Sequence, residues 1–465
     1  MNHSLRTIAA TPNTKRTGYV RQKHAGKLWV RERIEQLLDK GSLREIGSVG
    51  GKVSRRQTSA LKEEPEDLTP SNNVQGFGKL RGRQVAYVPP LHGAHEIIKL
   101  LNAGISNLGA AVGTAIALGA ARLVACHFSV MGADIGSMFN AGPSVVAGAT
   151  FEEGLSFTEL GGPAVHCTNG NIDNLAADEA GCFEHIRDVL AYLPNCGTQT
   201  PPFIPSDDPV DRSSPELRTM IPRKRERMFD PRKIIRLVVD IGSFFEIGAL
   251  WGRTTIVGLA RLGGRPVGII SNNCEHLAGA LDTAGSRKVT KDLKFCDVFN
   301  IPILQLVDVP GHARGTVAER TAVMRWGVEL WKTYYTTTVP LFNVIVRKVY
   351  GVASGVMVEC HDPHTRVAWP SGERGSLPLT GGIDVGHAAE LRQIEKEQGL
   401  DARTARYKEL EEEYKRLINP VRTANAFSIE EIIDPAQTRE LVAEWCRMVY
   451  ETELPEACSW PRMSL

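Results

Sequence analysis

LLDKGSLREIG, residues 37–47, returns later in the chain as VVDIGSFFEIG, residues 238–248. Asp, Gly, Ser, Glu, Ile and Gly recur in step between the two stretches. Self-similarity of this kind is the sequence signature of an internal duplication. The pair therefore predicts two tandem copies of one fold within the chain.

A candidate β-hairpin follows each copy. VQGFGKLRGRQVAYV begins at Val74, and IVGLARLGGRPVGII begins at Ile256. Both alternate apolar with small residues and turn at Arg-Gly or Gly-Gly, which is typical of a two-residue hairpin loop. We therefore expect the same unit twice, namely a helix that ends at a glycine turn and then a hairpin.

The two halves differ in length after the hairpin. The second half continues with an expected helix at 280–300, a strand at 301–311, a helix at 316–336 and a strand at 339–357. Strands that alternate with helices indicate a layered α/β core with parallel pairing. The first half reaches its glycine-rich segment LGAAVGTAIALG about 30 residues after its hairpin turn, against nearly 90 in the second half. It therefore lacks roughly 50 to 60 residues, which correspond to the stretch around CDVFNIPILQLVDVPG.

Composition excludes several classes of protein. The 465 residues carry 55 basic and 53 acidic side chains, and this balance argues against a dedicated nucleic-acid binder. Nine scattered cysteines without a C-x-x-C pair are typical of a reducing compartment. No stretch predicts a membrane span. Residues 1–27 hold six Lys or Arg and no acidic residue, which fits a mitochondrial transit peptide or a basic tail, so cytoplasmic and mitochondrial locations are both open.

Proline density divides the chain. Six prolines and the basic cluster RKRER predict a linker over residues 195–230, between an N-terminal domain at 1–194 and a C-terminal domain at 231–465. The polar stretch at 52–73 is also expected to be a linker. Near the C-terminus, the sequence predicts a solvated helix with i,i+4 charge pairs from residue 401 and a docking helix in the last segment.

The segment at 108–126 is a first candidate for binding negative charge through backbone amides. Its small residues let a ligand approach the backbone closely. If Gly113 and Thr114 stand at a helix start, their amides form an oxyanion hole. The alternative is a Gly/Ala helix packed tightly against a sheet.

The segment at 347–357 is a second candidate of the same kind. It follows an apolar strand, and Gly351, Ala353, Ser354 and Gly355 open a predicted helix, whose dipole adds positive potential. The alternative is a strand-to-helix turn that uses glycine only for close packing.

A loop at 308–320 follows a buried strand, where α/β proteins bind ligands. His312 and Arg314 are candidates there for contacting an anionic group, with a solvated loop as the alternative. The pairs His92/His95 and His361/His364 have metal-like spacing but lack a third and fourth ligand nearby, so no metal site is predicted.

The longer motifs resemble a known family. FFEIGALWGRTTIVGLARLGGRPVGIISNN, LKFCDVFNIPILQLVDVPG and TVPLFNVIVRKVYGVASGVM, with MFNAGPSVV and FTELGGPAVH in the first half, resemble the carboxyltransferase β subunit of biotin-dependent acyl-CoA carboxylases, of the propionyl-CoA type. The resemblance runs from about Gly26 to Glu451 and skips the stretch between Val88 and Leu108. It implies an α/β fold of tandem crotonase-like (ClpP/crotonase) domains, the first one truncated.

This resemblance implies an enzyme that moves a carboxyl group between carboxybiotin and the α-carbon of an acyl-CoA. Biotin would come in trans, on a biotin carboxylase or biotin carrier subunit, because the chain has no Met-Lys biotinylation site. Two backbone oxyanion holes would hold the thioester enolate and the biotin ureido oxygen, one at Gly113 and Thr114 and the other at Val352 and Ala353. The site would form between two subunits, so the resemblance implies a dimer-based homo-oligomer, without nucleic acid or membrane.

The resemblance also implies a substrate-binding set, which is Gly311, His312, Tyr350, Gly351 and Gly355. The family has two glycines in each turn, and Val352 stands at one of these positions and would crowd the cofactor. Gly355 occupies a position where the family tunes acyl size, so a glycine there leaves room for a larger acyl group.

Two alternatives follow from these departures. A biotin-independent enzyme of the same fold would use its oxyanion holes for decarboxylation or another enolate reaction on a thioester or β-keto acid. A non-catalytic assembly subunit would follow from the shortened first half. Dependence of turnover on biotin discriminates among the three.

Overall fold

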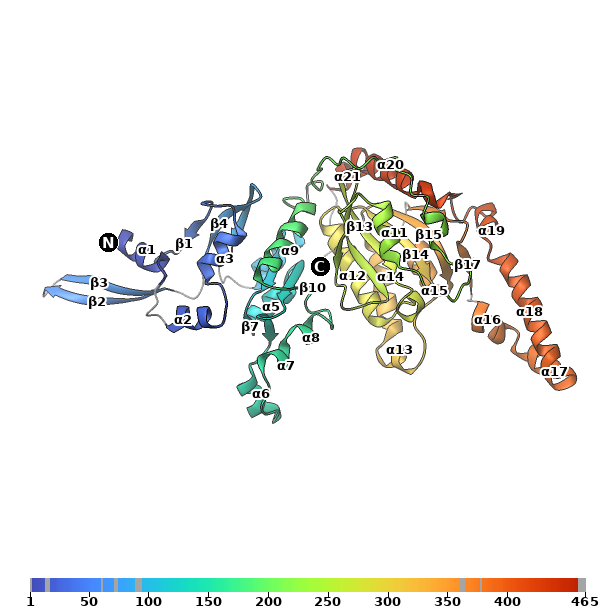
Figure 1. Ribbon diagram of the computed structural model, residues 1–465, viewed down its shortest axis with the longest axis horizontal. Coiled ribbons are helices and arrows are strands. Elements are labelled where there is room, and N and C mark those ends of the chain that lie inside the picture. Colours follow the sequence, from blue (N-terminus) through green and yellow to red (C-terminus); the bar gives the residue numbers. More distant parts are fainter. Residues whose placement is uncertain are drawn as a thin grey trace.

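The computed structural model describes residues 2–12, 17–59, 62–70, 74–87, 94–359, 364–376 and 379–458 (Figure 1). The helices of the first half are α1 (Asn2–Ala10), α2 (Thr17–His24), α3 (Val30–Leu37), α4 (Ala94–Asn102), α5 (Leu118–Ala125), α6 (Pro143–Thr150), α7 (Phe157–Gly161), α8 (Pro163–His166) and α9 (Glu179–Tyr192). Its strands are β1 (Arg44–Ile46), β2 (Gly51–Ser59), β3 (Lys62–Pro70), β4 (Gln75–Leu80), β5 (Arg83–Tyr87), β6 (Leu108–Ala111), β7 (Thr114–Ile116), β8 (Phe128–Gly132), β9 (Ser137–Phe139) and β10 (Asn174–Ala176).

The second half is longer between its hairpin and its C-terminal helices. Its strands are β11 (Phe245–Ile247), β12 (Thr255–Leu262), β13 (Arg265–Asn272), β14 (Ile303–Val309), β15 (Leu341–Tyr350), β16 (His364–Ala368), β17 (Glu373–Gly375) and β18 (Glu431–Ile432). Its main helices are α10 (Leu217–Met220), α11 (Pro231–Val238), α12 (Thr283–Val298), α13 (Thr316–Arg320), α14 (Val323–Thr336), α15 (Gly351–Ser354), α16 (Leu379–Gly386), α17 (Ala388–Gln398), α18 (Leu400–Leu417), α19 (Pro420–Asn425), α20 (Thr438–Glu451) and α21 (Glu453–Ala457).

The predicted duplication is confirmed by matching hydrogen bonds. Asp39, after α3, accepts bonds of 2.8 and 2.7 Å from both turn amides of the β4–β5 hairpin. Asp240, after α11, accepts bonds of 2.9 and 2.8 Å from the turn amides of Gly263 and Gly264, between β12 and β13. Positive φ angles in both turns aim two neighbouring amides at one carboxylate. Each aspartate of the repeated motif thus fixes the hairpin that follows it.

The first half lacks the elements that the second half places between its hairpin and its next helix. Fifty residues, 273–322, separate β13 from α14 and include α12 and β14, whereas six residues, 88–93, separate β5 from α4. The difference of 44 residues is smaller than the 50 to 60 expected. The missing elements are nevertheless the expected helix and strand. Since α4 leads into β6 as α14 leads into β15, α4 is the counterpart of α14.

Loss of that strand splits the sheet of the first half. In the second half, eight strands form one sheet in the order β11-β12-β13-β14-β15-β16-β18, with β17 beside β15. There β14 lies between β13 and β15 and pairs parallel with both. The counterparts in the first half form two three-stranded sheets, β1-β4-β5 and β10-β8-β6. Among the described strands, β5 pairs only with β4 and β6 only with β8.

Helix α12 joins the two halves (Figure 1). The rings of Phe295 and Phe299 lie 6.4 and 4.7 Å from the ring of His127 in the first half, between centroids. Lys291 Nζ pairs with the buried Asp173 Oδ1 at 2.5 Å. One hydrophobic cluster therefore runs through both halves.

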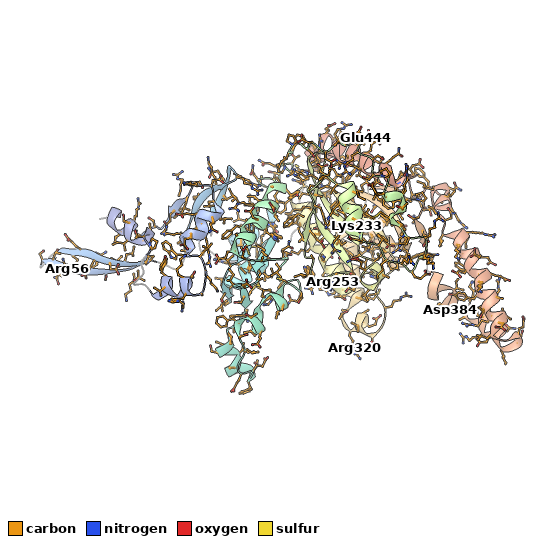
Figure 2. The ribbon with its side chains drawn as sticks, viewed as in Figure 1. Arg56, Lys233, Arg253, Arg320, Asp384 and Glu444 are labelled. Atoms are coloured by element: carbon orange, nitrogen blue, oxygen red, sulfur yellow. The ribbon has the colours of Figure 1, made fainter. Side chains whose placement is uncertain are left out.

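The stretch expected to be a linker at 52–73 is not one. The strands β2 and β3 form an antiparallel hairpin, and Figure 2 shows Arg56 near its outer end. A basic strand lies against an acidic strand in this hairpin, with Arg56 opposite Glu64 and Gln57 opposite Glu63. Cross-strand pairs of opposite charge stabilise such a ribbon, and Leu68 and Val53 of the hairpin also pack against Leu5 and Ala9 of α1.

The other segments follow the sequence more closely. Within residues 195–230 the helix α10 is the one regular element, and the domain limits at 194 and 231 stay a prediction. The predicted C-terminal helices are α18 and α20. The helix expected at 316–336 is divided into α13 and α14, because Ala322 adopts a left-handed φ of 60° between them.

Candidate active site

The turn after β15 is the better-formed of the two candidate sites. Gly351 has a φ of +62°, which favours glycine, and directly opens α15. The N–H groups of the first helical turn have no acceptor within the helix, so those of Val352 and Ala353 are available to a negatively charged ligand. The predicted strand-to-helix turn at 351 is therefore confirmed.

The side chains around this turn leave it open. Val352 is 65% exposed, whereas Ala353 is fully buried. A five-residue π-helix, Gly355–Glu359, continues α15. A Cβ added at Gly355 would find its nearest heavy atom, Glu359 Oε2, at 3.9 Å. There is therefore space beside Gly355 for a ligand group.

Tyr350, the last residue of β15, holds the turn in place through the hydrogen bonds of its side chain. It is buried, its hydroxyl donates to Glu373 Oε2 at 2.9 Å, and it accepts from Arg225 Nη2 at 2.7 Å. Arg225 also pairs with Glu373 directly. Burial, followed by the charge of Glu373, raises the pKa of Tyr350. Tyr350 therefore positions the backbone of the turn rather than presenting its hydroxyl to a ligand.

The loop after β14 leaves the same sheet edge as this turn. Val309 of β14 pairs with Val349 of β15, so the loop at Gly311 and the turn at Gly351 begin side by side. Gly311 has a φ of +128°, and its carbonyl accepts from the Leu281 amide at 3.0 Å. This loop therefore forms one wall of the candidate site.

His312 lies in this loop but does not act as a cation. Its ring packs against Gly327 of α14, within 2.8 Å of where a Cβ would stand. Burial lowers its pKa, so the imidazole is neutral at pH 7. The expected contact of His312 with an anionic group stays a prediction, and the neutral ring would make it by hydrogen bonding rather than by charge. Arg314, also expected there, is exposed.

A buried ion pair that sequence reasoning missed supports this edge. Arg347 of β15 makes two bonds to the Asp308 carboxylate, at 3.1 and 2.7 Å, and both residues are buried. Asp308 also accepts from the Lys348 amide at 3.0 Å. The signal was present, because charged residues within two apolar strands need a partner. This pair locks β14 to β15 just before their loops.

Gly113 and Thr114 do not stand at a helix start. Gly113 lies between β6 and β7, and its carbonyl accepts from the Ser137 amide at 3.2 Å. Thr114 begins β7, and its Oγ1 accepts from Ser137 Oγ at 2.9 Å. The helix begins only at Leu118. The expected helix start at these residues is therefore not found, and the oxyanion hole at Gly113 and Thr114 stays a prediction.

The strand register locates the counterpart of the 351 turn in the first half. Strand β7 pairs with β9 as the end of β15 pairs with β17, and in each pair the last register position is the residue before the turn, Ile116 or Tyr350. Ala117 therefore matches Gly351, and its φ of 49° is positive in the same way. Leu118, 51% exposed, matches the exposed Val352.

The two turns lie in different halves and do not meet within one chain. Figure 1 shows α5 in the first half and α15 in the second, with α12 between them. Within the described ranges, no three His, Cys, Asp or Glu side chains gather to hold a metal ion. The pairs His92/His95 and His361/His364 involve side chains outside those described. None of the helices described is both long and apolar enough to cross a bilayer.

The tandem architecture, with a strand-to-helix turn in each half, is a crotonase-like carboxyltransferase fold. Residues 71–459 match the family model of the carboxyl transferase domain, and the chain belongs to that family. The expected fold class is thus confirmed, and so is the resemblance to propionyl-CoA carboxylase β chains.

Named relatives support the same conclusion. The propionyl-CoA carboxylase carboxyltransferase subunit of Haloferax mediterranei is 36% identical over 326 residues, which are 69% of this chain and 62% of that relative, less than two thirds of its length. The propionyl-CoA carboxylase beta chain of Roseobacter denitrificans is 30% identical over 479 residues, covering 91% and 90%. The mitochondrial beta chain of Homo sapiens is 30% identical over 476 residues, covering 90% and 84%.

A solved structure matches nearly the whole chain. The transcarboxylase 12S hexamer, with methylmalonyl-coenzyme A and methylmalonic acid bound, has a TM-score of 0.83 and 26% identity over 97% of this chain and 94% of that one.

Proposed function

We propose that the chain is a carboxyltransferase subunit that moves a carboxyl group to or from the α-carbon of an acyl-CoA. The observation that carries this proposal is a residue of positive φ where a strand passes into a helix in both halves, Ala117 just before α5 and Gly351 at the first position of α15. Each turn offers free backbone amides and no side-chain acid or base, which suits the stabilisation of an oxyanion.

The amides of Val352 and Ala353 form one oxyanion hole in this proposal. The amides of Leu118 and Gly119, their counterparts by register, form the other and replace the pair first expected at Gly113 and Thr114. A biotin carried by a partner subunit supplies or accepts the carboxyl group. One hole holds the developing enolate oxygen of the thioester, and the other holds the ureido oxygen of the biotin. The positive end of the helix at each hole favours this negative charge.

Substrate is held at the edge formed by the turn and the loop after β14. Gly311 and Gly351 allow close approach of the ligand to the backbone, and Gly355 leaves space for the acyl group. Tyr350 keeps the turn in place through Glu373 and Arg225. His312 contributes a neutral ring and no charge.

A second copy of the chain completes the site. The two turns lie apart within one chain, so each needs a turn of the other kind from a partner, which implies a homo-oligomer built from dimers. The exposed Leu118 and Val352 would face that partner. The biotin carboxylase or biotin carrier subunit docks on this assembly.

The test removes the backbone N–H of Val352, whose side chain is exposed and is not part of the core. Val352→Pro deletes the N–H at an exposed position in the first helical turn, where proline is tolerated, and Val352→Ala keeps the N–H. Loss of carboxyl groups from malonyl-CoA and methylmalonyl-CoA is measured by mass spectrometry with and without free biotin. We expect biotin-dependent loss that falls roughly 100- to 1,000-fold in the proline variant and remains in the alanine variant.

Other outcomes select the alternatives. Loss of the carboxyl group without biotin would identify a biotin-independent decarboxylase. A folded protein without turnover under either condition would favour an assembly subunit or a different thioester or carboxylic acid as the substrate. Equal activity of the proline and alanine variants would remove Val352 from the oxyanion hole.

A further inference from the structure

A cavity of about 380 Å³ occupies the place of the missing strand in the first half. Its two sides are strand edges, formed by Val85 and Ala86 of β5 and by residues Leu108 to Ala110 of β6. Helices α3, α5 and α9 also line it. The second half fills the corresponding space between β13 and β15 with β14. We call this cavity the slot.

The walls of the slot are mainly apolar. Phe183, Ile186 and Leu190 of α9 cover one face, and Leu123 of α5 contributes to the other. The volume lies within the range of small-molecule sites, about 300–1,000 Å³. A hydrocarbon ligand in an apolar cavity gains free energy from each methylene group that the cavity removes from water. The walls therefore favour an unbranched hydrocarbon chain.

Two polar atoms at the slot lack a hydrogen-bond partner in the described part of the chain. They are Ser106 Oγ and Arg122 Nε, and both are buried. The other arginine of the slot, Arg33, is already paired with Glu179 at 2.7 Å. A buried guanidinium nitrogen without an acceptor is unfavourable. The Nε–H of Arg122 is therefore available to donate a hydrogen bond to an oxygen atom of a ligand.

An inserted peptide strand fits the slot less well than a hydrocarbon chain. The carbonyl of Val112, just beyond β6, accepts from Arg33 Nη2 at 2.8 Å, so the end of this edge is already occupied. An apolar strand also brings no anionic oxygen to Arg122. A hydrocarbon chain that ends in a carboxyl-derived oxygen satisfies both the apolar walls and the two unpartnered polar atoms.

We propose that the slot binds an unbranched hydrocarbon chain of fatty-acyl length, with its terminal oxygen on Arg122 and Ser106. The chain has two possible sources, a free fatty carboxylate or the acyl chain of a thioester. The slot is also lined by Gly119, which belongs to the first turn of α5, so it reaches the proposed oxyanion hole of the first half. Only the thioester source rests on the proposed function.

The first experiment closes the slot in the full-length protein. Gly119 lines the slot and has nothing within 4 Å of an added Cβ, so Gly119→Leu is expected to reduce the space in the slot without a clash at its Cβ. Gly148→Leu on α6 is the matched control, since Gly148 is equally open and does not line the slot. Titration calorimetry with dodecanoate is expected to show binding by the parent and by Gly148→Leu, and at least tenfold weaker binding by Gly119→Leu.

A second pair of ligands tests the polar end. Arg122→Gln is expected to weaken dodecanoate binding about tenfold, because a charge-assisted hydrogen bond is lost, and to leave dodecanol binding unchanged. Dodecanoyl-CoA distinguishes the two sources. A thioester carbonyl oxygen is neutral, so Arg122→Gln should weaken dodecanoyl-CoA binding less than it weakens dodecanoate binding, whereas Gly119→Leu should weaken both. No binding of dodecanoyl-CoA would leave the free carboxylate as the source.

Two results would overturn the proposal. One is equal dodecanoate affinity in the parent and in Gly119→Leu when circular dichroism shows both folded. The other is binding of the nonapeptide IPILQLVDV, the sequence of residues 301–309, without any binding of dodecanoate, which would make the slot a strand acceptor. These readouts need no turnover, so a failed carboxyl-transfer assay with intact dodecanoate binding counts against the proposed function alone.

Discussion

The second half of the chain builds one continuous sheet, whereas the first half builds the same motifs around a gap. Both halves keep the helix, the aspartate that caps the hairpin, and the strand-to-helix turn. Only the first half lacks the strand that connects these parts. The comparison shows that the local parts of the unit form without its central strand, because each is held by its own short-range hydrogen bonds. The interior, in contrast, depends on α12 from the other half.

The largest expected difference between the halves concerns the two capping aspartates. Asp240 is buried and also pairs with the fully buried Arg439 at 2.9 Å, whereas Asp39 is half-buried. Asp240→Ala leaves buried donors without their acceptor, so we expect a loss of about 3 kcal/mol in the free energy of unfolding. Asp39→Ala exposes its two amides to water, and we expect about 1 kcal/mol. Urea denaturation measures both values.

An exposed aspartate serves as the control for this pair. Asp401→Ala, at the start of α18, is expected to change stability by less than about 0.5 kcal/mol. Equal losses for Asp39→Ala and Asp240→Ala would contradict the view that the hairpin of the first half is the more weakly embedded of the two.

Acid is expected to loosen the contact between the halves. His127 Nδ1 accepts from the Asn107 amide at 3.1 Å, and the ring packs on Phe299. Burial lowers its pKa from 6.5 to about 4. Since the unfolded chain binds this proton first, stability is full above pH 6.5 and is lost as the pH falls toward 4. We expect a loss of about 2 kcal/mol between pH 7 and pH 5, measured by urea denaturation at each pH.

His127→Gln isolates this effect from other titrating groups. Glutamine keeps one donor for the Leu101 carbonyl and one acceptor for the Asn107 amide, but it does not titrate. The variant should therefore lose about 2 kcal/mol less than the parent between the same two pH values. An unchanged difference would assign the acid sensitivity to other groups.

The smallest expected effects compare the two turns. Gly351 has a φ of +62°, so Gly351→Ala should cost about 1 kcal/mol of stability. Ala117 has a φ of 49° and a ψ of −113°, so Ala117→Gly should gain about the same amount. Thermal unfolding of the two variants measures both. Destabilisation by Ala117→Gly would show that the first turn does not share the conformation of the second.

Much of this architecture was predictable because its signals are local. The repeated motif, the two hairpins and the turn at Gly351 are specified by glycines and aspartates at fixed spacing. The first turn was expected at Gly113, because that position offered a glycine, whereas the positive φ belongs to Ala117. Alignment of Ile116 with Tyr350 was the signal that could have found it. The β2–β3 hairpin was missed because cross-strand charge pairs look like a polar linker in a single sequence.

No local sequence pattern predicts the slot or the hydrophobic core that the two halves share. Removal of a strand predicts a gap, but whether the flanking strands close over it depends on packing between distant segments. Arg122 and Ser106 gain their meaning only from the cavity beside them. The same holds for His127, whose role depends on Phe295 and Phe299, far along the chain.

The shared helix α12 also sets the order in which the chain can fold during synthesis. The first half is complete at the end of α9, at Tyr192, but α12 ends only at Val298. At a ribosomal rate of about 5–20 residues per second, α12 is complete roughly 5 to 20 s after the end of the first half. Through that interval the faces of Phe128 and His127 stay open to solvent, because their partners have not been made. The nascent first half is therefore a substrate for chaperones until the second half emerges.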